Sequence, residues 1–557
     1  MPIQPTYPGV YVEEIPSGVR TITGVSTSIT AFIGRALRGP VDEAITINSY
    51  GDFERIFGGL WLNSTLGYAV RDFYLNGGSQ AIIVRLIHSK QGQGQAPDQG
   101  QAPDQGQTPD QGQAPGQSQT SDQGQATAKK AQLNVNGLNL EAANEGSWGN
   151  ALKVRIEYVD INVRDDAESQ KLFNITVLDQ NTSQLEVFRN VSVLPNHPRR
   201  VDKVLLNESY FVRFRDESLP TDRPAAHAQP TLDKKLWDDN DTNTKAEENS
   251  GADGDDLDVN DFTGLNKEAN KQGLYALNKA DLFNILCIPP YKNDGNIDYD
   301  SLVDSAAEFC KDRRAFFIID PPTNWTDKDK AKDGIQNLGA PTSYAAVFFP
   351  RIKQPNPLRE NQIEEFVPCG AIAGVFARTD VQRGVWKAPA GTEATLTGVP
   401  QLSVPLTDPE NGELNPLGIN CLRTLPAFGR VIWGSRTRKG DDRLTDEWKY
   451  IPVRRFALFL EESLYRGTQW AVFEPNDEPL WAQIRLNLGA FMHTLFLQGA
   501  FQGRKPEDAY FVKCDKETTI QNDINLGIVN IIVGFAPLKP AEFVILKIQQ
   551  IAGQIAV

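Results

Sequence analysis

The apolar residues near the end of the chain alternate in a way that predicts a strand from Leu526 to Phe535. One face of this strand carries Val529, Ile531 and Val533, and the other carries Leu526, Ile528 and Ile532. Only Asn530 interrupts the pattern. Because both faces are apolar, we expect a strand that has neighbours on both sides.

A second strand is expected beyond a break in the chain. The break runs from Pro537 to Pro540, and the strand runs from Phe543 to Ile548, with Val544 and Leu546 on one side. A strand at a terminus exposes unpaired N–H and C=O groups together with an apolar face. Burying each Val, Ile or Leu side chain is worth roughly 1.5–3 kcal/mol. We therefore expect this arm to find a partner, which on a hinged segment can be another copy of the chain.

The N-terminus shows a similar pattern. A short strand is predicted from Val10 to Ile15, and Pro16, Ser17 and Gly18 end it. The segment is thus a second terminal strand joined through a flexible break. Pairing within its own chain, as an ordinary terminal strand, fits the pattern equally well.

Between these ends, the first piece of the chain reads as a compact α/β unit. Strands are predicted at Thr27 to Ile33 and Ala81 to Ile87, and helices at Ser49 to Phe57 and Thr65 to Leu75. The region from Gln132 to Phe214 is β-rich. Its predicted strands are Leu152 to Val159, Leu172 to Leu178 and Gln184 to Leu194.

A parallel α/β unit is expected in residues 281–350. Its strands are Leu282 to Ile288, Ala315 to Ile319 and Tyr344 to Phe349, and Ser301 to Lys311 forms a helix. Asp320 ends the second strand, a position where an acid can be catalytic. No glycine-rich phosphate loop precedes it. We therefore interpret Asp320 as a turn or helix-cap residue.

The final third predicts two helices. The first, Val453 to Arg466, is amphipathic, with Gly467 ending it and a strand following at Thr468 to Phe473. A longer helix then begins after Asp477, and a strand follows at Tyr510 to Cys514. The apolar face of the longer helix is Trp481, Ile484, Leu488, Phe491 and Leu495.

Composition and charge narrow the possible functions. The 557 residues are 40% hydrophobic and 23% charged, and the net charge is −15. Most of this charge lies in the low-complexity tract Gln91 to Gln125, which we expect to be disordered, and in the acidic stretch Leu219 to Asp261, a solvated loop that fails the spacing of a calcium loop. Without a basic stripe, direct nucleic-acid binding is disfavoured.

The sequence offers little catalytic or metal-binding chemistry. The four histidines and five scattered cysteines form no known metal spacing, and the cysteines suit buried thiols in a reducing compartment. We expect no catalytic residue, no cofactor and no metal. Arg436 to Lys439, beside Asp441 and Asp442, reads as a loop that is solvated or bridges subunits. No apolar run reaches a membrane span and no secretory signal is visible, so cytoplasmic synthesis and assembly are expected, with lysis as one route of release.

Several longer motifs give the chain a resemblance to a known family. They are PGVYVEEIPSG, ITAFIGRALRGP and GGSQAIIVRL near the N-terminus and GSWGNALKV at Gly146 to Val154. The C-terminal motifs are AGVFARTDVQRGVWKAPAG, LNPLGINCLR, WKYIPVRRFALFLEESLYRGTQWAVFEPN and VGFAPLKPAEFVILKIQQ. The chain resembles the sheath proteins of contractile phage tails and related phage-tail-like injection systems, over roughly residues 1–90 and 280–557.

The resemblance implies a mixed α/β, multidomain subunit whose core is built from both chain ends. It implies hexameric rings stacked helically around an inner tube protein, with baseplate and terminal cap proteins as further partners and no membrane insertion. The implied arm strands are Val10, Tyr11, Val12 and Glu13, and Phe543, Val544, Ile545, Leu546 and Ile548. The candidate receiving strand is Ile528, Val529, Ile531 and Val533.

The expected organisation places outer domains within that core. The segments are an N-terminal arm (1–22), core (23–90), low-complexity insert (91–130), β-rich outer domain (131–218), acidic loop (219–270), α/β domain (271–370), core (371–536) and C-terminal arm (537–557). Two alternatives come from other classes: an α/β enzyme, resting on residues 281–350, and a capsid or adhesin protein. Within the sheath interpretation, a true bacteriophage tail is the alternative to an injection system.

Overall fold

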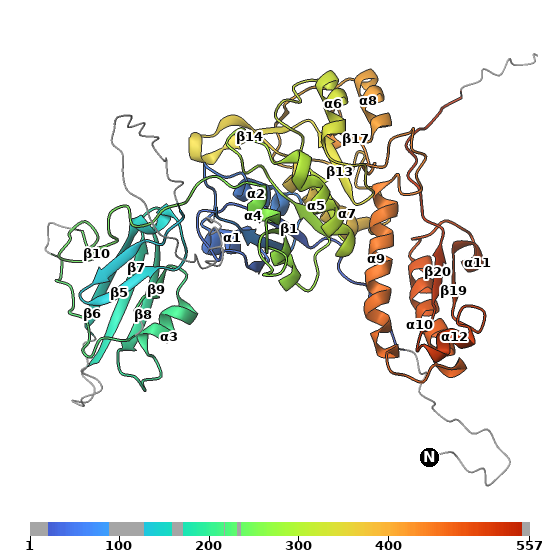
Figure 1. The fold of residues 1–557 in the computed structure, drawn as a ribbon. Coiled ribbons are helices and arrows are strands. Elements are labelled where there is room, and N and C mark those ends of the chain that lie inside the picture. Colours follow the sequence, from blue (N-terminus) through green and yellow to red (C-terminus); the bar gives the residue numbers. More distant parts are fainter. Residues whose placement is uncertain (1–19, 89–126, 159–170, 217, 231–234, 548–557) are drawn as a thin grey trace, which may run out of the picture.

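A computed structural model describes residues 20–88, 127–158, 171–216, 218–230 and 235–547. Figure 1 shows three bodies in a row: a β-rich body, a central α/β body, and a C-terminal body built on two long helices. The chain is therefore a mixed α/β protein with several folded parts, as predicted. The predicted strand Val10 to Ile15 and the low-complexity tract lie outside the described residues.

The central body is organised on an eight-stranded sheet of order β18-β17-β13-β12-β11-β1-β3-β2. The inner strands run parallel, and β2 and β18 are antiparallel at the two edges. Thr30 pairs with Ile285, so segments far apart in the sequence form adjacent strands. The bounds are β1 (Thr30–Gly34), β2 (Ala44–Ile47), β3 (Ala81–Arg85), β11 (Ile285–Cys287), β12 (Phe316–Ile319), β13 (Ala345–Phe349), β17 (Ile419–Leu425) and β18 (Gly429–Ile432).

Helices cover both faces of this sheet, because the strands are apolar on both sides. One face packs against α1 (Tyr50–Phe57), α2 (Leu66–Leu75) and α7 (Cys369–Arg383), and the other against α4 (Val259–Thr263) and α5 (Tyr299–Asp312). The predicted parallel order of the strands in residues 281–350 is confirmed, as are the two early helices. The remaining elements nearby are α6 (Lys328–Gly334), α8 (Asp408–Leu414) and a small sheet of β14 (Ile352–Asn356), β15 (Gln362–Phe366) and β16 (Gln401–Leu402).

Close contact between α2 and α7 depends on a glycine. A Cβ atom at Gly370 would lie 1.9 Å from the carbonyl oxygen of Ala69. Asp320 fixes the start of α7, since its Oδ1 accepts a hydrogen bond from the Cys369 backbone N–H at 2.9 Å. The interpretation of Asp320 as a helix-cap residue is confirmed.

The β-rich body contains two sheets, of order β10-β6-β7-β8 and β4-β5-β9. Their bounds are β4 (Gln132–Val135), β5 (Leu138–Ala142), β6 (Leu152–Tyr158), β7 (Leu172–Asp179), β8 (Gln184–Ser192), β9 (Val212–Phe214) and β10 (Thr244–Lys245), with α3 (Val201–Glu208) beside them. Strand β10 lies in the acidic stretch, which therefore wraps back onto this body instead of forming only a solvated loop. An ion pair between two buried side chains links the β-rich body to the central body. Arg38 Nη1 of the central body lies 2.6 Å from Asp179 Oδ2 of the β-rich body.

The C-terminal body pairs α9 (Ile451–Thr468) with α10 (Glu478–Leu497), and the predicted apolar face of α10 is buried. The prediction that Gly467 ends the first helix is wrong, since α9 continues past it. Ile22 packs so closely there that a Cβ atom at Gly467 would lie 2.6 Å from its Cγ2. The predicted strand Thr468 to Phe473 is also wrong, because residues 469–471 form a turn of 3₁₀ helix.

The rest of the C-terminal body comprises two short helices, α11 (Pro506–Ala509) and α12 (Gln521–Asn525), and a small antiparallel hairpin. The hairpin pairs β19 (Tyr510–Lys513) with β20 (Ile532–Phe535), and the chain continues from β20 into the arm. The ring of Phe456 on α9 lies 5.6 Å from the ring of Phe535, which joins hairpin to helix. All five cysteines are buried and free. In the described ranges no helix has the length and apolar character needed to cross a bilayer.

Candidate assembly surface around the C-terminal arm

The candidate receiving strand is shorter than predicted. Strand β20 begins at Ile532, so Val533 lies in it, whereas Ile528, Val529 and Ile531 precede it. The chain before it forms α12 and a turn at Gly527, which has a positive φ of 72°. The residues that were predicted to form the first half of a strand therefore lie in this turn and in the irregular segment that follows it.

The alternation itself is present, but only one face is covered. Val529, Ile531 and Val533 pack against the core of α10. The prediction of neighbours on both sides is wrong, because the opposite face is exposed to solvent. That face and its surroundings form an apolar patch, 43–66% exposed: Phe511, Ile520, Leu526, Ile528 and Ile532.

Both edges of the hairpin are open in the described part of the chain. Strands β19 and β20 pair only with each other, with Val512 opposite Val533. An open edge presents N–H and C=O groups that can pair with an added strand. Edge and apolar patch therefore lie on one small element.

The C-terminal arm leaves this body as an extended apolar segment. Side chains from Phe543 to Leu546 are 73–82% exposed. Residues 543–547 belong to no helix or strand, so the predicted strand is unpaired over its described length. Figure 1 shows this end of the chain running away from the body. Ile548, and the N-terminal arm residues Val10, Tyr11, Val12 and Glu13, lie outside the described residues.

The root of the arm is anchored by Glu542. Its carboxylate accepts hydrogen bonds from Arg436 Nε and Nη2, both at 2.7 Å, from Asn415 Nδ2 at 2.7 Å and from Tyr450 Oη at 3.1 Å. Burial raises the pKa of Glu542, but these hydrogen bonds, chiefly those from Arg436, bring it below its usual value. The carboxylate is therefore held ionised.

This anchor corrects the interpretation of the basic run. Arg436 and Arg438 are buried, not solvated. Arg438 Nη2 donates to the carbonyl of Ile335 at 3.0 Å, inside the central body. No role was predicted for Glu542, whose only signal in the sequence is its place as an isolated acid directly before four apolar residues.

A cavity of about 870 Å³ lies beside the anchor, between the arm root and the body. Its walls include the indole rings of Trp386 and Trp433 and the basic side chain of Lys387. Leu538 and Phe543 close it from the arm side. The arm root therefore spans a partly apolar hollow instead of packing flat on the body.

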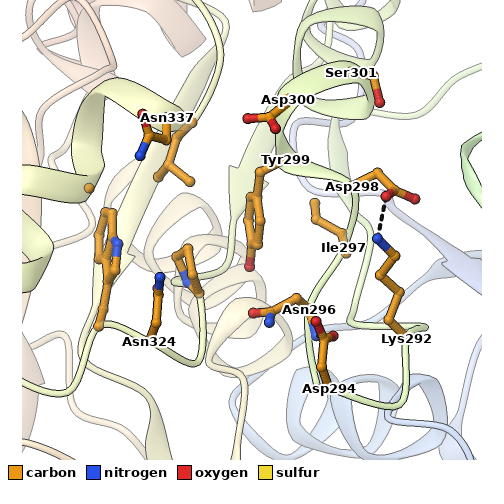
Figure 2. Close-up of a pocket in the computed structure, with 14 residues that line it drawn as sticks. Lys292, Asp294, Asn296, Ile297, Asp298, Tyr299, Asp300, Ser301, Asn324 and Asn337 are labelled. Atoms are coloured by element: carbon orange, nitrogen blue, oxygen red, sulfur yellow. Dashed lines mark hydrogen bonds and ion pairs between the residues drawn. The ribbon is translucent and has the colours of Figure 1, made fainter.

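A polar hollow of the α/β unit lies elsewhere and bears on the enzyme alternative. Figure 2 shows it, a cavity of about 710 Å³ with Lys292 paired to Asp298 at its rim. Asn296 bonds Thr323 at 2.9 Å, so several of its polar groups satisfy one another. The residues that line it include neither histidine nor cysteine. Lys292, Asp298 and Asn296 are thus held by local ion-pair and hydrogen-bond contacts.

Asp320 is the most perturbed acid of the same unit. Burial raises the pKa of its carboxyl to about 7. Such a shift can mark a catalytic group. Here the carboxyl is shut inside the fold, and its hydrogen bond to the Cys369 N–H gives it a structural task.

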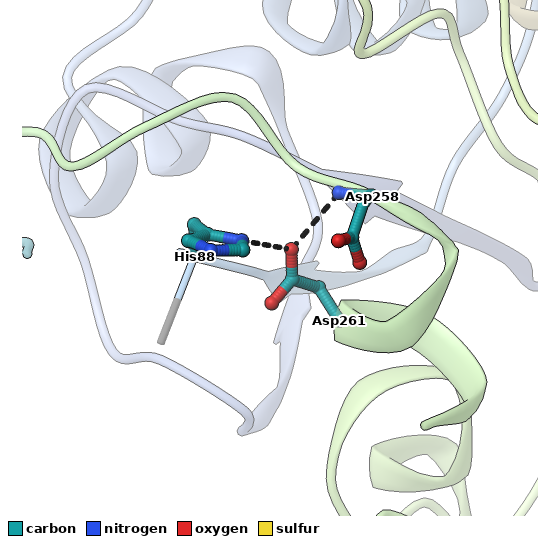
Figure 3. Close-up of side chains that lie close together, drawn as sticks. All are labelled: His88, Asp258 and Asp261. Carbon is teal, nitrogen blue, oxygen red and sulfur yellow. Dashed lines mark hydrogen bonds and ion pairs between the residues drawn. The ribbon is translucent and has the colours of Figure 1, made fainter. Parts of the chain in front are cut away.

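A third cluster joins His88 to two acids. Figure 3 shows the His88 ring and the Asp258 backbone N–H both directed at the Asp261 carboxylate. His88 Nδ1 lies 3.0 Å from Asp261 Oδ2, and this oxygen accepts a hydrogen bond from the Asp258 N–H at 3.0 Å. The three side chains have potential metal-ligand atoms within 4.8 Å of one another. Asp258 and Asp261 form the capping box of α4, and this local capping accounts for their positions.

Comparison with known families defines the class of the protein. The model described as the phage tail sheath protein central domain matches residues 263–438, and that of the phage tail sheath C-terminal domain matches residues 444–551. Together they span just over half of the chain. The chain belongs to the family of contractile tail sheath proteins.

Individual relatives agree with this class. Over 172 residues the chain is 26% identical to a prophage major tail sheath protein of Pseudomonas aeruginosa, covering 30% of this chain and 42% of that one. Over 119 residues it is 28% identical to the tail sheath protein of Enterobacteria phage T4, covering 21% and 18%. The alignments thus span less than half of either curated relative.

Solved structures share the fold over nearly the whole chain. The helical sheath of the anti-feeding prophage in its contracted state matches with a TM-score of 0.54 at 22% identity, covering 98% of this chain and 99% of that one. The PVC sheath complex of an extracellular contractile injection system, also contracted, matches at 0.53 and 21%, covering 98% of each. A sheath tail protein of Listeria innocua matches at 0.55 and 12%, covering 93% and 96%.

Proposed function

We propose that this chain is the sheath subunit of a contractile phage-tail-like injection system. It polymerises into stacked hexameric rings around an inner tube and contracts to drive that tube through a target envelope. Baseplate proteins lie at one end of the assembly, and terminal cap proteins lie at the other. The observation that carries the proposal is the exposed apolar arm, Phe543 to Leu546, in a chain of the sheath family.

The arm has the properties of a strand that a second copy completes. Full burial of its four large side chains would contribute roughly 6–12 kcal/mol before the cost of ordering the arm. The open hairpin edge at β20 and the apolar patch around Ile532 supply matching backbone groups and apolar contacts. A head-to-tail contact of this kind that does not close gives an open helix.

In this proposal the firing energy comes from two packings of the same subunits. An extended sheath is held by the inner tube, and release lets subunits rotate into a better-packed lattice while the arms stay paired. No nucleotide or cofactor takes part. The β-rich body and the α/β segment 271–370 are outer parts, and residues 23–90 and 371–536 with both arms belong to the polymerising core, although β1 and β11 share one sheet.

A contractile bacteriophage tail is the second candidate, favoured by the match to the phage T4 sheath protein. The injection-system form is supported by the anti-feeding prophage and PVC sheath structures, whose fold matches over nearly the full length of the chain. Electron microscopy of purified particles separates the two, since a phage tail carries a DNA-filled head.

The decisive experiment removes the arm and keeps its anchor. A variant lacking residues 543–557 should fold as a monomer with an unchanged thermal transition, yet form no tubes in negative-stain images under conditions where the full chain, alone or with the inner tube protein, does. Normal striated tubes from the shortened chain would refute the role of the arm. Closed shells from the full chain would instead favour a capsid protein.

A further inference from the structure

The segment between β20 and the arm is held at both ends. Upstream, Ala536 accepts a hydrogen bond from the Gln502 N–H at 2.9 Å, and Pro537 forms a bridge with Phe501. Downstream, Glu542 sits in its socket of Arg436, Asn415 and Tyr450. The stretch Pro537 to Pro540, expected from sequence to be the hinge, is therefore fixed on each side.

The socket is part of the rigid body. The Arg436 side chain is 1% exposed, and its Nη1 donates to the Gly440 carbonyl at 3.0 Å. The Arg436 backbone is also fixed, because its N–H and C=O both bond the buried Asn420 side chain, at 2.7 and 2.8 Å. A guanidinium held in this way presents its two N–H groups to a carboxylate in one orientation.

Exposed and partly buried residues alternate up to Glu542, and every residue from 543 to 547 is exposed. The Glu542 side chain is 17% exposed, whereas the next residue, Phe543, is 73% exposed. We propose that Glu542 is the pivot of the C-terminal arm: residues 537–542 move with their own subunit, and the swinging part begins at Phe543. This inference rests on the proposed exchange of arms between subunits.

A fixed pivot has two consequences for assembly. It shortens the flexible tether, which raises the effective concentration of the arm at a neighbouring hairpin. It also passes tension on the arm directly into Arg436 and the body behind it, so the Pro-containing root does not stretch when subunits rotate. Loss of the carboxylate would add residues 537–542 to the tether and weaken both effects.

Spin labels test the pivot in the full chain without any need for assembly. The introduced cysteines are Ala541→Cys, just before the pivot, and Leu546→Cys, beyond it; the native cysteines are buried and should react slowly. We expect a slow-motion spectrum at 541 and a fast one at 546. Glu542→Ala should make the 541 spectrum fast. The control Glu413→Gln removes an exposed ion pair to Lys328 and should leave both spectra unchanged.

Assembly then separates this inference from the proposed function. Glu542→Ala should raise the critical concentration for tube formation at least tenfold, while Glu413→Gln leaves it unchanged. Because Glu542→Ala takes a carboxylate from the buried Arg436, its thermal transition should fall, and assembly is compared at a temperature where every monomer is folded. Equal motion at 541 and 546 in the parent, or no effect of Glu542→Ala, would overturn the pivot even if the arm deletion abolishes tubes. If the arm deletion still forms tubes, the proposed function itself fails.

Discussion

Replacing Leu546 with aspartate separates the stability of the monomer from the stability of the assembly. The Leu546 side chain is 82% exposed, so the free energy of unfolding of the isolated chain should change by less than about 0.5 kcal/mol. In an assembly that buries the arm, the same change removes roughly 1.2–2.5 kcal/mol of apolar burial, scaled from full burial of a leucine. This corresponds to roughly a 7- to 60-fold weaker contact, and desolvating the new carboxylate weakens it further.

The assay is the critical concentration for tube formation, measured by sedimentation and checked by negative-stain images. Leu265→Asp is the matched control, since Leu265 is 79% exposed but lies on the central body. We expect a large increase for Leu546→Asp, a small one for Leu265→Asp, and equal melting temperatures. An unchanged critical concentration for Leu546→Asp would refute burial of the arm in a neighbour. An equal increase in the critical concentration for both variants would show that the arm contributes no more to assembly than another exposed surface.

Three further predictions concern buried charge. Because the net shift of the Glu542 pKa is downward, its anchoring should be complete above about pH 4.5 and lost as the pH falls below that value, which the spin label at 541 would report. Because burial raises the pKa of Asp320 to about 7, its ionisation opposes folding as the pH rises from about 4 through 7; the stabilisation by Asp320→Asn in thermal unfolding should therefore be about 2.5 kcal/mol larger at pH 8 than at pH 5. Asp179→Ala leaves the Arg38 guanidinium buried and unpaired, and should cost about 3–5 kcal/mol in denaturant unfolding, whereas a solvated pair would cost under about 1 kcal/mol.

Periodicity in the sequence was enough to predict the elements that pack within their own chain. The face of α10 from Trp481 to Leu495 follows helical spacing, and the structure buries it. The parallel strands of the central sheet read as continuous apolar runs, and the sheet covers them on both sides. These predictions depend on local spacing, which the sequence records directly.

The failures have a common physical origin in contacts between distant parts of the chain. Gly467 is predicted to end the first helix, but α9 runs one residue further, to Thr468, and Ile22 from the other end of the chain packs against Gly467. Arg436 reads as solvated because its partner, Glu542, lies 106 residues away. The apolar pattern around Ile532 predicts burial without saying whether the covering atoms belong to the same molecule, so an assembly surface resembles a core strand.

The attachment of the β-rich body has a consequence for how such particles diversify. The Asp179 end of β7 and the Gln184 end of β8 meet Arg38 on the central body, whereas the loop of residues 194–199 lies at the opposite end of β8. Foreign sequence inserted in that loop would therefore leave both the docking pair and the C-terminal arm untouched. Under the proposed function, this loop is the position of the β-rich body where peptides can be grafted, or natural variation can accumulate, at the greatest remove from the Arg38–Asp179 contact.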